Sequence, residues 1–425
     1  MFQRVATVFL LSLNVQLIPL YYGLAVDTNA KNVADLELLC HIIKLHSAST
    51  ESLDDGDLPN TEKDELEKLN TTLSVPAWKG IFQTAESKDD EDPAYCSKAS
   101  DKPACIKQWN KWKKLAAAAA ASENLPSKVL HDAAKLTSPA GTAAQLMMAQ
   151  ILAEADALEA NYKTNIQKEI TAAKKLQTGK LQDAIFGKQA KPDTANSRCT
   201  AAVQTNRQIT CKPSKAVATV CGTAVCICAK DATQQNGDLC SDATSSTQLN
   251  YGSSNIGTVY EAIASKCAHA PAEKLSSQRI HSLIAAFKAR LKTYHAVGGA
   301  VVYLGTVSSD TNNCASSDSN GCADFTELAA SKAVTAVKTD NWIDQLLEAA
   351  ETLRIAEAAT NKRKETVTRL QNLLKKGREL YTRLAVVEAP TLIGKPTDGT
   401  TGATNKHQAA TAKEEAKKEC NSAKD

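Results

Sequence analysis

The sequence is poor in aromatic residues, and beyond its first 25 residues it has no apolar run that could span a membrane. Aromatic side chains make up only 4% of the 425 residues, whereas alanine is abundant. Alanine favours helices and lets them pack closely, but it supplies little bulk for a wide core. The composition therefore favours slender helices over a broad sheet. The apolar run Val297–Leu304 is far too short to cross a bilayer.

Sequence signatures of catalysis and cofactor binding are missing. No GxSxG, HExxH, P-loop or dinucleotide-binding motif occurs. The seven histidines show no metal-ligand spacing, and His41 and His46 are five residues apart, which suits one helical face poorly. The carboxylates fall mostly on the surfaces of predicted helices. We therefore expect no enzyme activity, no cofactor, no metal and no small-molecule substrate.

A large excess of charge of one sign is also missing. The formal net charge is +3, which is close to neutral for a chain of this length. Such a balance gives no basic field that would attract nucleic acid or an anionic lipid surface. The basic runs Lys107–Lys114 and Lys362–Arg383 are explained as solvated helix faces. We expect no nucleic-acid partner.

The N-terminus has the pattern of a secretory leader. Residues 1–25 carry one charge at Arg4, an apolar run over Val8–Leu20 and the small-residue ending Gly23-Leu24-Ala25. These are the three regions of a signal peptide, which we predict is cleaved after Ala25. The remaining chain then matures in an oxidising compartment, where cysteines form disulfides by default.

Thirteen cysteines follow the leader, and twelve of them precede a Gly/Thr-rich stretch near the C-terminus. An even number predicts a disulfide framework, without specifying its connectivity. A metal cluster at Cys221, Cys226 and Cys228 is the alternative, but the leader favours disulfides. Cys420 is left unpaired in this fragment, which predicts a chain truncated inside a second, small disulfide domain. The twelve predicted disulfide cysteines are Cys40, Cys96, Cys105, Cys199, Cys211, Cys221, Cys226, Cys228, Cys240, Cys267, Cys314 and Cys322.

Two segments have the strongest helical periodicity. One heptad frame runs from Trp342 to Leu384, with a polar interruption near its middle. A helix of that length would be roughly 65 Å long and cannot bury its apolar stripe alone. We predict that its antiparallel partner is the segment Thr142–Leu176. In that segment the apolar stripe shifts by one residue after Tyr162, which predicts a local break in register.

Shorter helices are predicted over Val33–Ile43, Pro103–Ala121 and Leu275–Tyr294, from apolar residues at helical spacing. Trp109 and Trp112 lie three residues apart on one face of the second of these helices. Tryptophans at that spacing are explained by core packing, with a ligand cage as the alternative.

Helical periodicity is lost between the two long helices. Residues 191–267 are rich in cysteine, Thr, Ser, Asn and Gln, which predicts a loop-rich lobe with short strands such as Ala218–Cys228. Residues 307–322 form a second polar lobe, for which we predict closure by a Cys314–Cys322 disulfide. The predicted fold is mainly α: an elongated antiparallel coiled-coil helical bundle with disulfide-rich loop lobes inserted between the long helices.

The predicted organisation has four parts. The signal peptide, 1–25, precedes an N-terminal elongated helical domain at 26–388. A flexible linker rich in Gly, Thr and Pro follows at 389–419, and 420–425 begins the truncated C-terminal domain. The only N-glycosylation sequon begins at Asn70, in an acidic segment that we expect to lie at the surface, so Asn70 is the predicted glycosylated residue.

Taken together, these features resemble the trypanosome variant surface glycoproteins. The resemblance is carried by the leader, the early helix ADLELLCHIIKL with its single Cys40, the cysteine-rich insertion and the long terminal helix. It extends to the Gly/Thr linker that leads into KKECNSAKD, which is similar to the start of the family's small membrane-proximal domain. It covers essentially the whole chain, and the cysteine layout is closer to the family's B class than to its A class.

The resemblance implies a dimer or trimer on the outer face of the plasma membrane, held by a glycosylphosphatidylinositol (GPI) anchor. Such proteins form a dense coat that shields the cell, meets host antibodies and is replaced by antigenically different versions. No C-terminal apolar tail that would signal anchor attachment is present in this sequence. Some B-class members carry an O-linked sugar on an outward serine-rich loop. The candidates here are Ser308, Ser309, Ser316, Ser317 and Ser319.

Two other functions compete with the coat protein. A nutrient receptor of the transferrin or haptoglobin–haemoglobin type could use a related helical scaffold, and saturable binding of one serum protein would favour it. The polar lobes lack the aromatic or apolar anchor cluster that such binding uses. A secreted helical enzyme would need convergent titratable residues in a pocket, and the sequence offers none that can be assembled.

Overall fold

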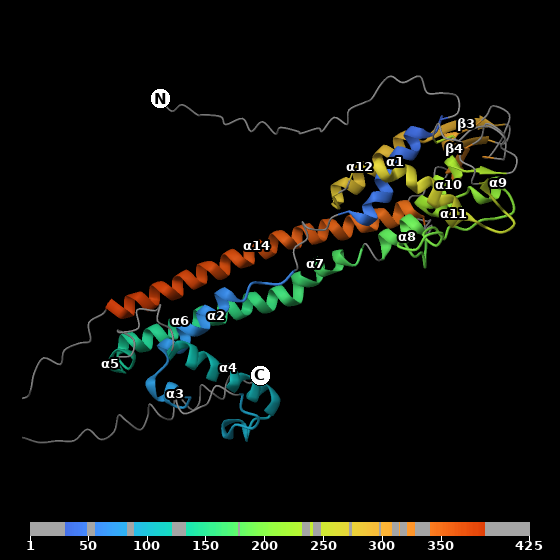
Figure 1. The fold of residues 1–425 in the computed structure, drawn as a ribbon. Helices are drawn as coiled ribbons and strands as arrows, with labels where there is room; N and C mark the ends of the chain where they lie inside the picture. Colours follow the sequence, from blue (N-terminus) through green and yellow to red (C-terminus); the bar gives the residue numbers. More distant parts are fainter. Residues whose placement is uncertain are drawn as a thin grey trace, which may run out of the picture. The chain divides into compact units, whose positions relative to one another are not determined.

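Figure 1 shows the fold in a computed structural model. The structure describes residues 30–48, 56–82, 89–120, 133–176, 179–231, 239–240, 248–271, 274–296, 299–307, 314, 321–327 and 341–386. The chain divides into two compact units. Unit 1 comprises Met1–Glu62 and Glu154–Asn372, and unit 2 comprises Lys63–Ala153 and Leu373–Asp425. The described residues are predominantly helical, which confirms the predicted mainly α class.

Unit 1 contains two small sheets and most of the short helices. Two long helices, α6 (Pro139–Asn161) and α14 (Trp342–Val386), contribute one part to each unit. The other elements of unit 1 are α1 (Val33–Lys44), η1 (Leu45–Ser47), η4 (Tyr162–Ile166), α7 (Gln167–Lys174), α8 (Lys180–Phe186), α9 (Arg207–Thr210), η5 (Ala216–Ala218), α10 (Val220–Cys228), β1 (Lys230–Asp231), β2 (Gln248–Leu249), α11 (Ile256–Ala264), η6 (Ser265–His269), α12 (Ser277–Arg290), β3 (Lys292–Ala296), β4 (Gly299–Thr306) and β5 (Gly321–Asp324).

Unit 2 is helical throughout its described residues. Besides its parts of α6 and α14, its elements are α2 (Thr61–Leu73), α3 (Pro76–Gly80), η2 (Ala94–Cys96), α4 (Lys102–Ala120) and α5 (Ala133–Leu136). The predicted helix Pro103–Ala121 is therefore present as α4, displaced by a single residue at each end.

The helix α14 is 45 residues long and confirms the long terminal helix predicted from the heptad frame. Two of its predicted core positions, Arg363 and Val367, are only half-buried. Others are buried in both units, including Leu346 and Leu353 in unit 1 and Tyr381 and Leu384 in unit 2. The polar interruption at Thr360 is also buried, and its hydroxyl donates a hydrogen bond to the Ala356 carbonyl at 2.9 Å. That bond satisfies the hydroxyl locally, so the stripe continues through it.

The segment Lys135–Lys180 contributes residues to both units, and within each unit α14 runs antiparallel to it. In unit 1, Ala359 packs against Tyr162 and Ile170, and the earlier Glu348 pairs with the later Lys180. In unit 2, Gly377 lies against Met148 of α6, and the Lys135 ammonium donates to the Ala385 carbonyl. In both units, residue numbers increase along α14 while they decrease along the segment opposite it, so the two run antiparallel. Supercoiling of the pair stays a prediction.

The predicted break in register is a π-helical turn, η4, between α6 and α7. Tyr162 and Ile166 at its two ends are buried, as is Ile170 one turn later. A π turn holds more residues than an α turn, so it absorbs one residue and keeps the stripe on one face. The Tyr162 hydroxyl donates to the Gly56 carbonyl at 2.6 Å, which fixes this turn against the chain before α2.

The prediction of strands over Ala218–Cys228 is wrong, because this segment contains the helix α10. All nine residues of α10 are buried. A helix surrounded by protein is apolar on every side, so it shows no amphipathic period and cannot be told from a buried strand by pattern. The Thr219 hydroxyl caps its N-terminus by accepting from the Gly222 amide at 3.0 Å. The lobe at 191–267 thus has a helical core.

A second correction concerns the helix predicted over Leu275–Tyr294. The helix α12 ends at Arg290, and Tyr294 lies in strand β3. The strands pair antiparallel in the order β3-β4-β5, with Tyr294 opposite Val301 and Gly305 opposite Cys322. Hairpin pairing of β3 with the next strand, β4, overrides the local helical pattern here.

Candidate functional site

The core of unit 1 is built around α10, which contacts α1, α8, α11 and β5 (Figure 1). Its three cysteines each join a different neighbouring segment, so the helix is held covalently on several sides. The twelve cysteines predicted to form disulfides pair as Cys40–Cys267, Cys96–Cys105, Cys199–Cys221, Cys211–Cys226, Cys228–Cys240 and Cys314–Cys322. The predicted Cys314–Cys322 pair is among them.

A fully buried asparagine joins four segments of unit 1. The Asn32 amide donates to the carbonyls of Ile227 at 2.8 Å and of Gly321 at 2.7 Å. Its side-chain oxygen accepts from the Thr306 hydroxyl at 2.7 Å, and its backbone N–H donates to the Leu239 carbonyl. The N-terminal end of α1 is thereby tied to α10, to β4 and to β5.

A buried arginine completes the C-terminal end of α10. The Arg207 guanidinium donates to the Ala229 carbonyl at 2.6 Å and to the Cys226 carbonyl at 3.3 Å. A cation is favoured there because the helix dipole is negative at its C-terminus. Its Nε lies 3.9 Å from the Asp231 carboxylate, and both side chains are 1% exposed. The Tyr251 hydroxyl donates to the same carboxylate at 3.1 Å.

A second buried carboxylate ties α1 to α12 and β3. Asp35 is paired with Arg290 and lies 3.8 Å from the Lys292 ammonium. Cys40 on the same helix is bonded to Cys267 of η6. In unit 1, every buried charge described above is therefore matched by an opposite charge, as burial requires. These groups hold α1, α10, α12 and β3 together within unit 1.

The sequon lies in the C-terminal part of α2 in unit 2, and Asn70 is half-buried. We predict this acidic segment as a surface excursion with one short helix, and the segment does contain the helix α2. Leu66 and Leu69 on the same helix are almost completely buried. Whether Asn70 carries a sugar stays a prediction.

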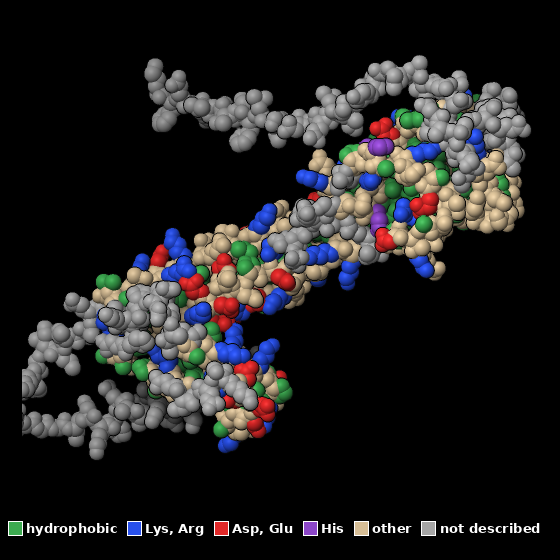
Figure 2. All heavy atoms as spheres, in the orientation of Figure 1, with side chains coloured by type: hydrophobic (Ala, Val, Ile, Leu, Met, Phe, Trp, Pro, Cys, Tyr) green, Lys and Arg blue, Asp and Glu red, His purple; other side chains and the backbone are tan. Residues whose placement is uncertain are grey.

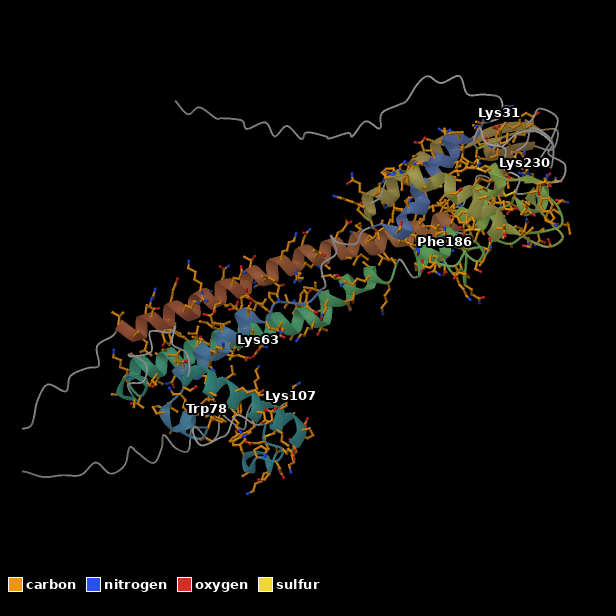
Figure 3. The ribbon with its side chains drawn as sticks, viewed as in Figure 1. Lys31, Lys63, Trp78, Lys107, Phe186 and Lys230 are labelled. Atoms are coloured by element: carbon orange, nitrogen blue, oxygen red, sulfur yellow. A yellow bond between two sulfur atoms is a disulfide. The ribbon has the colours of Figure 1, made fainter. Side chains whose placement is uncertain are left out.

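An aromatic cluster in unit 2 accounts for the tryptophan pair on α4. Trp109 contacts Phe82 at 4.9 Å and Tyr95 at 5.2 Å between ring centres, and Trp112 contacts Trp78 at 6.1 Å. Figure 3 labels Trp78 on the short helix α3. These contacts form a small aromatic cluster in unit 2, in which Phe82 is buried and the three tryptophans are half-buried.

The loop before η2 is attached to α4 by an aspartate. The Asp90 carboxylate accepts from the Trp109 indole at 2.8 Å and from the Lys113 ammonium at 3.0 Å. The indole hydrogen bond, followed by the Lys113 ammonium, holds the pKa of Asp90 below its usual value. The Cys96–Cys105 disulfide joins η2, which follows this loop, to α4 covalently.

Several predicted features lie outside the described residues. These are the leader, the linker at 389–419, Cys420, and the serines proposed for O-glycosylation, Ser308, Ser309, Ser316, Ser317 and Ser319. Of the second polar lobe, the structure places the closing disulfide and strand β5.

Among the residues that the structure places, no three His, Cys, Asp or Glu side chains come together as a metal site would require. No helix within the described ranges is both long and apolar enough to traverse a bilayer. Figure 2 shows acidic and basic side chains interspersed over the face in view, rather than a field of one sign.

Sequence reasoning missed the buried polar groups at Asn32, Asp35 and Arg207. The local sequence around each of the three does not indicate a buried polar contact, because the partner residues are distant in sequence. For example, Asn32 and its partner Gly321 are 289 residues apart in the sequence.

Comparison with known proteins identifies the family. A family model described as the trypanosomal VSG domain, of the B type, matches residues 17–372, which is well over half of the chain. A search of curated proteins finds no match. The matched range takes in all of unit 1 that the structure describes, with its disulfide framework and most of α14. The chain belongs to the trypanosome variant surface glycoprotein family, whose members are surface coat proteins.

Proposed function

We propose that this protein is a GPI-anchored coat antigen that shields the cell surface, undergoes antigenic variation and has no catalytic activity. The observation that carries the proposal is the family match over residues 17–372. The fold is compatible with it, because disulfides and buried polar groups hold the segments of unit 1 together. A protein that shields the cell needs a stable fold whose surface residues can change, and it does not need a reactive centre.

The proposed partners are other copies of the chain and host antibodies. Two large apolar side chains on α6 support self-association, since Leu146 is 64% exposed and Met147 is 54% exposed. Adjacent apolar side chains on a helix surface are typical of helix pairing. Sedimentation of the wild type and of the L146K/M147K double variant tests this, and the variant should be monomeric. Equal assembly of both proteins would place the contact elsewhere.

The coat function is tested by expressing the natural gene in trypanosomes and treating live cells with phosphatidylinositol-specific phospholipase C. Release of abundant protein from the surface is the expected result. A variant of the same gene without its C-terminal region serves as the control for anchoring. Protein found only in the medium, from the natural gene, would contradict a lipid-anchored coat.

Surface copy number then separates a coat from a receptor. A coat requires enough copies to cover the membrane, whereas a receptor acts at low density. Saturable binding of one serum protein to a sparse surface protein would favour the nutrient receptor, which uses a related helical scaffold.

A further inference from the structure

The hydroxyl that defines the sequon is sequestered inside the folded helix α2. The Thr72 side chain is 8% exposed, and its hydroxyl donates to the Lys68 carbonyl at 2.8 Å. The Thr72 carbonyl in turn accepts from the Lys79 ammonium at 3.0 Å, which brings α3 against the sequon. The hydroxyl of Ser74 donates to the Asn70 carbonyl at 2.9 Å, so the backbone at the sequon is also engaged.

Modification of Asn70 requires the asparagine and the hydroxyl two residues later to be held together. The reaction joins Asn70 Nδ2 to C1 of the sugar of a lipid-linked oligosaccharide diphosphate. The bond from C1 to the phosphate oxygen breaks, Nδ2 loses a proton, and the lipid diphosphate leaves. The sequon pattern itself shows that the acceptor is read through both side chains. On an α-helix, residues two apart point about 200° from each other, so α2 presents them on opposite sides.

Local unwinding of α2 is opposed by packing and by ion pairs. Leu66, Leu69 and Leu73 are each at most 1% exposed. Glu67 is paired with Lys111 of α4, and Glu65 makes two hydrogen bonds of 2.6 Å with Arg378 of α14. Opening the sequon therefore means detaching the C-terminal part of α2 from the core of unit 2.

From this geometry we infer that Asn70 is glycosylated only while α2 is unwound, chiefly before it folds against unit 2, so that its occupancy is set by a race between folding and modification. The inference rests on the proposed glycosylation of this residue. The rate at which α2 folds then determines the fraction of chains that carry a sugar at Asn70. Asn70 is half-buried and not fully enclosed, so a sugar attached earlier is compatible with the folded helix.

The test compares one acceptor in two states. The full chain, made with its disulfides in a bacterial periplasm, supplies folded and unmodified protein, and a peptide of residues 61–76 supplies the unfolded acceptor. An isolated helix of that length is marginal in water. Both are incubated with oligosaccharyltransferase and a lipid-linked oligosaccharide, and modification is followed by mass. The folded chain should react at least ~10-fold more slowly than the peptide, because it must first open locally.

Three variants sharpen the test. Lys68→Gly weakens α2 at an exposed position without removing the carbonyl that holds Thr72, and it should speed modification of the folded chain several-fold. Lys68→Ala removes the same side chain while preserving helix propensity, and it should leave the rate unchanged. Asn70→Gln identifies the site, because it should abolish modification. Circular dichroism confirms that each variant is folded.

The outcomes separate two failures. A folded chain that reacts as fast as the peptide overturns the race between folding and modification. A peptide that is never modified shows that Asn70 is not a usable acceptor, and it overturns the proposed glycosylation itself.

Discussion

The buried side chain of Asn32 shows how much of unit 1 depends on one polar residue. It replaces three hydrogen bonds to water with three bonds to groups from separate segments, at Ile227, Gly321 and Thr306. Its removal would leave those partners buried and unsatisfied. An unsatisfied buried group is more harmful than a missing hydrogen bond between exposed groups.

We predict that Asn32→Ala lowers the free energy of unfolding by about 3 kcal/mol, since two carbonyls and a hydroxyl lose their partner. Denaturant unfolding followed by circular dichroism measures the change. The exposed Asn165, which bonds only to Asn161, provides the control, and Asn165→Ala should change stability by less than about 0.5 kcal/mol. Equal effects of the two substitutions would contradict the role assigned to Asn32.

Asp90 predicts a pH dependence in unit 2. Its pKa is lowered because the Trp109 indole and the Lys113 ammonium bind the charged carboxylate. A lowered pKa means that the folded state gains stability above the ordinary pKa, near pH 4, and loses it as the pH falls through the folded value. Tryptophan fluorescence should therefore change in acid in the wild type. Asp90→Asn should remove that transition, whereas Asp64→Asn, at an exposed position of α2, should preserve it.

At the scale of elements, sequence pattern predicted the helices that have one buried face. The heptads of α14 gave its first residue correctly and its last within two positions, and the shift after Tyr162 marked the π turn η4. The pattern failed at α10, where burial on every side removes the amphipathic signal. It failed again beyond Arg290, where pairing of β3 with β4 outweighs the local apolar spacing.

Close packing of α10 predicts an unusual response to a helix-favouring substitution. A Cβ at Gly222 would collide with the Ala216 carbonyl and lie 2.8 Å from the Ala201 Cβ. Gly222→Ala should therefore destabilise by about 1–3 kcal/mol, although alanine favours helix more than glycine does. Gly80 of α3 has open space at the same position, so Gly80→Ala should stay within about 1 kcal/mol of the wild type. Thermal unfolding distinguishes them.

The π turn predicts that one deletion is tolerated where a neighbouring one is not. Removing Thr164 from η4 would convert the π turn to an α turn and keep Tyr162 and Ile166 on one face, so stability should change by only about 1 kcal/mol. Removing Ala157 from α6 would rotate the buried Ala155 by about 100° from Tyr162, and should cost about 2–5 kcal/mol. Similar urea midpoints for the two deletions would contradict the role of the turn.

At the scale of the whole molecule, the sequence predicted which cysteines pair but mostly not with which partner. The short loop between Cys314 and Cys322 pointed to its own closure, whereas Cys40 and Cys267 are 227 residues apart and nothing local joins them. The buried Arg207 was equally invisible, because the carbonyls it binds become neighbours only once α10 has formed. Long-range partners are a property of the fold and not of a sequence window.

The two kinds of disulfide predict different losses of stability. In the chain-entropy model, opening the Cys40–Cys267 loop costs roughly 5 kcal/mol, and opening the Cys314–Cys322 loop costs roughly 2.5 kcal/mol. Double serine variants of each pair, compared by denaturant unfolding, measure the two losses. A larger loss for the Cys314–Cys322 pair would show that native contacts, and not chain entropy, dominate.

Five of the six disulfides join cysteines no more than 22 residues apart, with separations of 9, 22, 15, 12 and 8. The Cys199–Cys221 and Cys211–Cys226 spans overlap, and they enclose Arg207 and most of the buried helix α10. Residues 97–104, between Cys96 and Cys105, are instead exposed or half-buried. Substitutions inside the Cys96–Cys105 span should therefore alter the surface at little cost to the fold, whereas the overlapping spans constrain their buried residues.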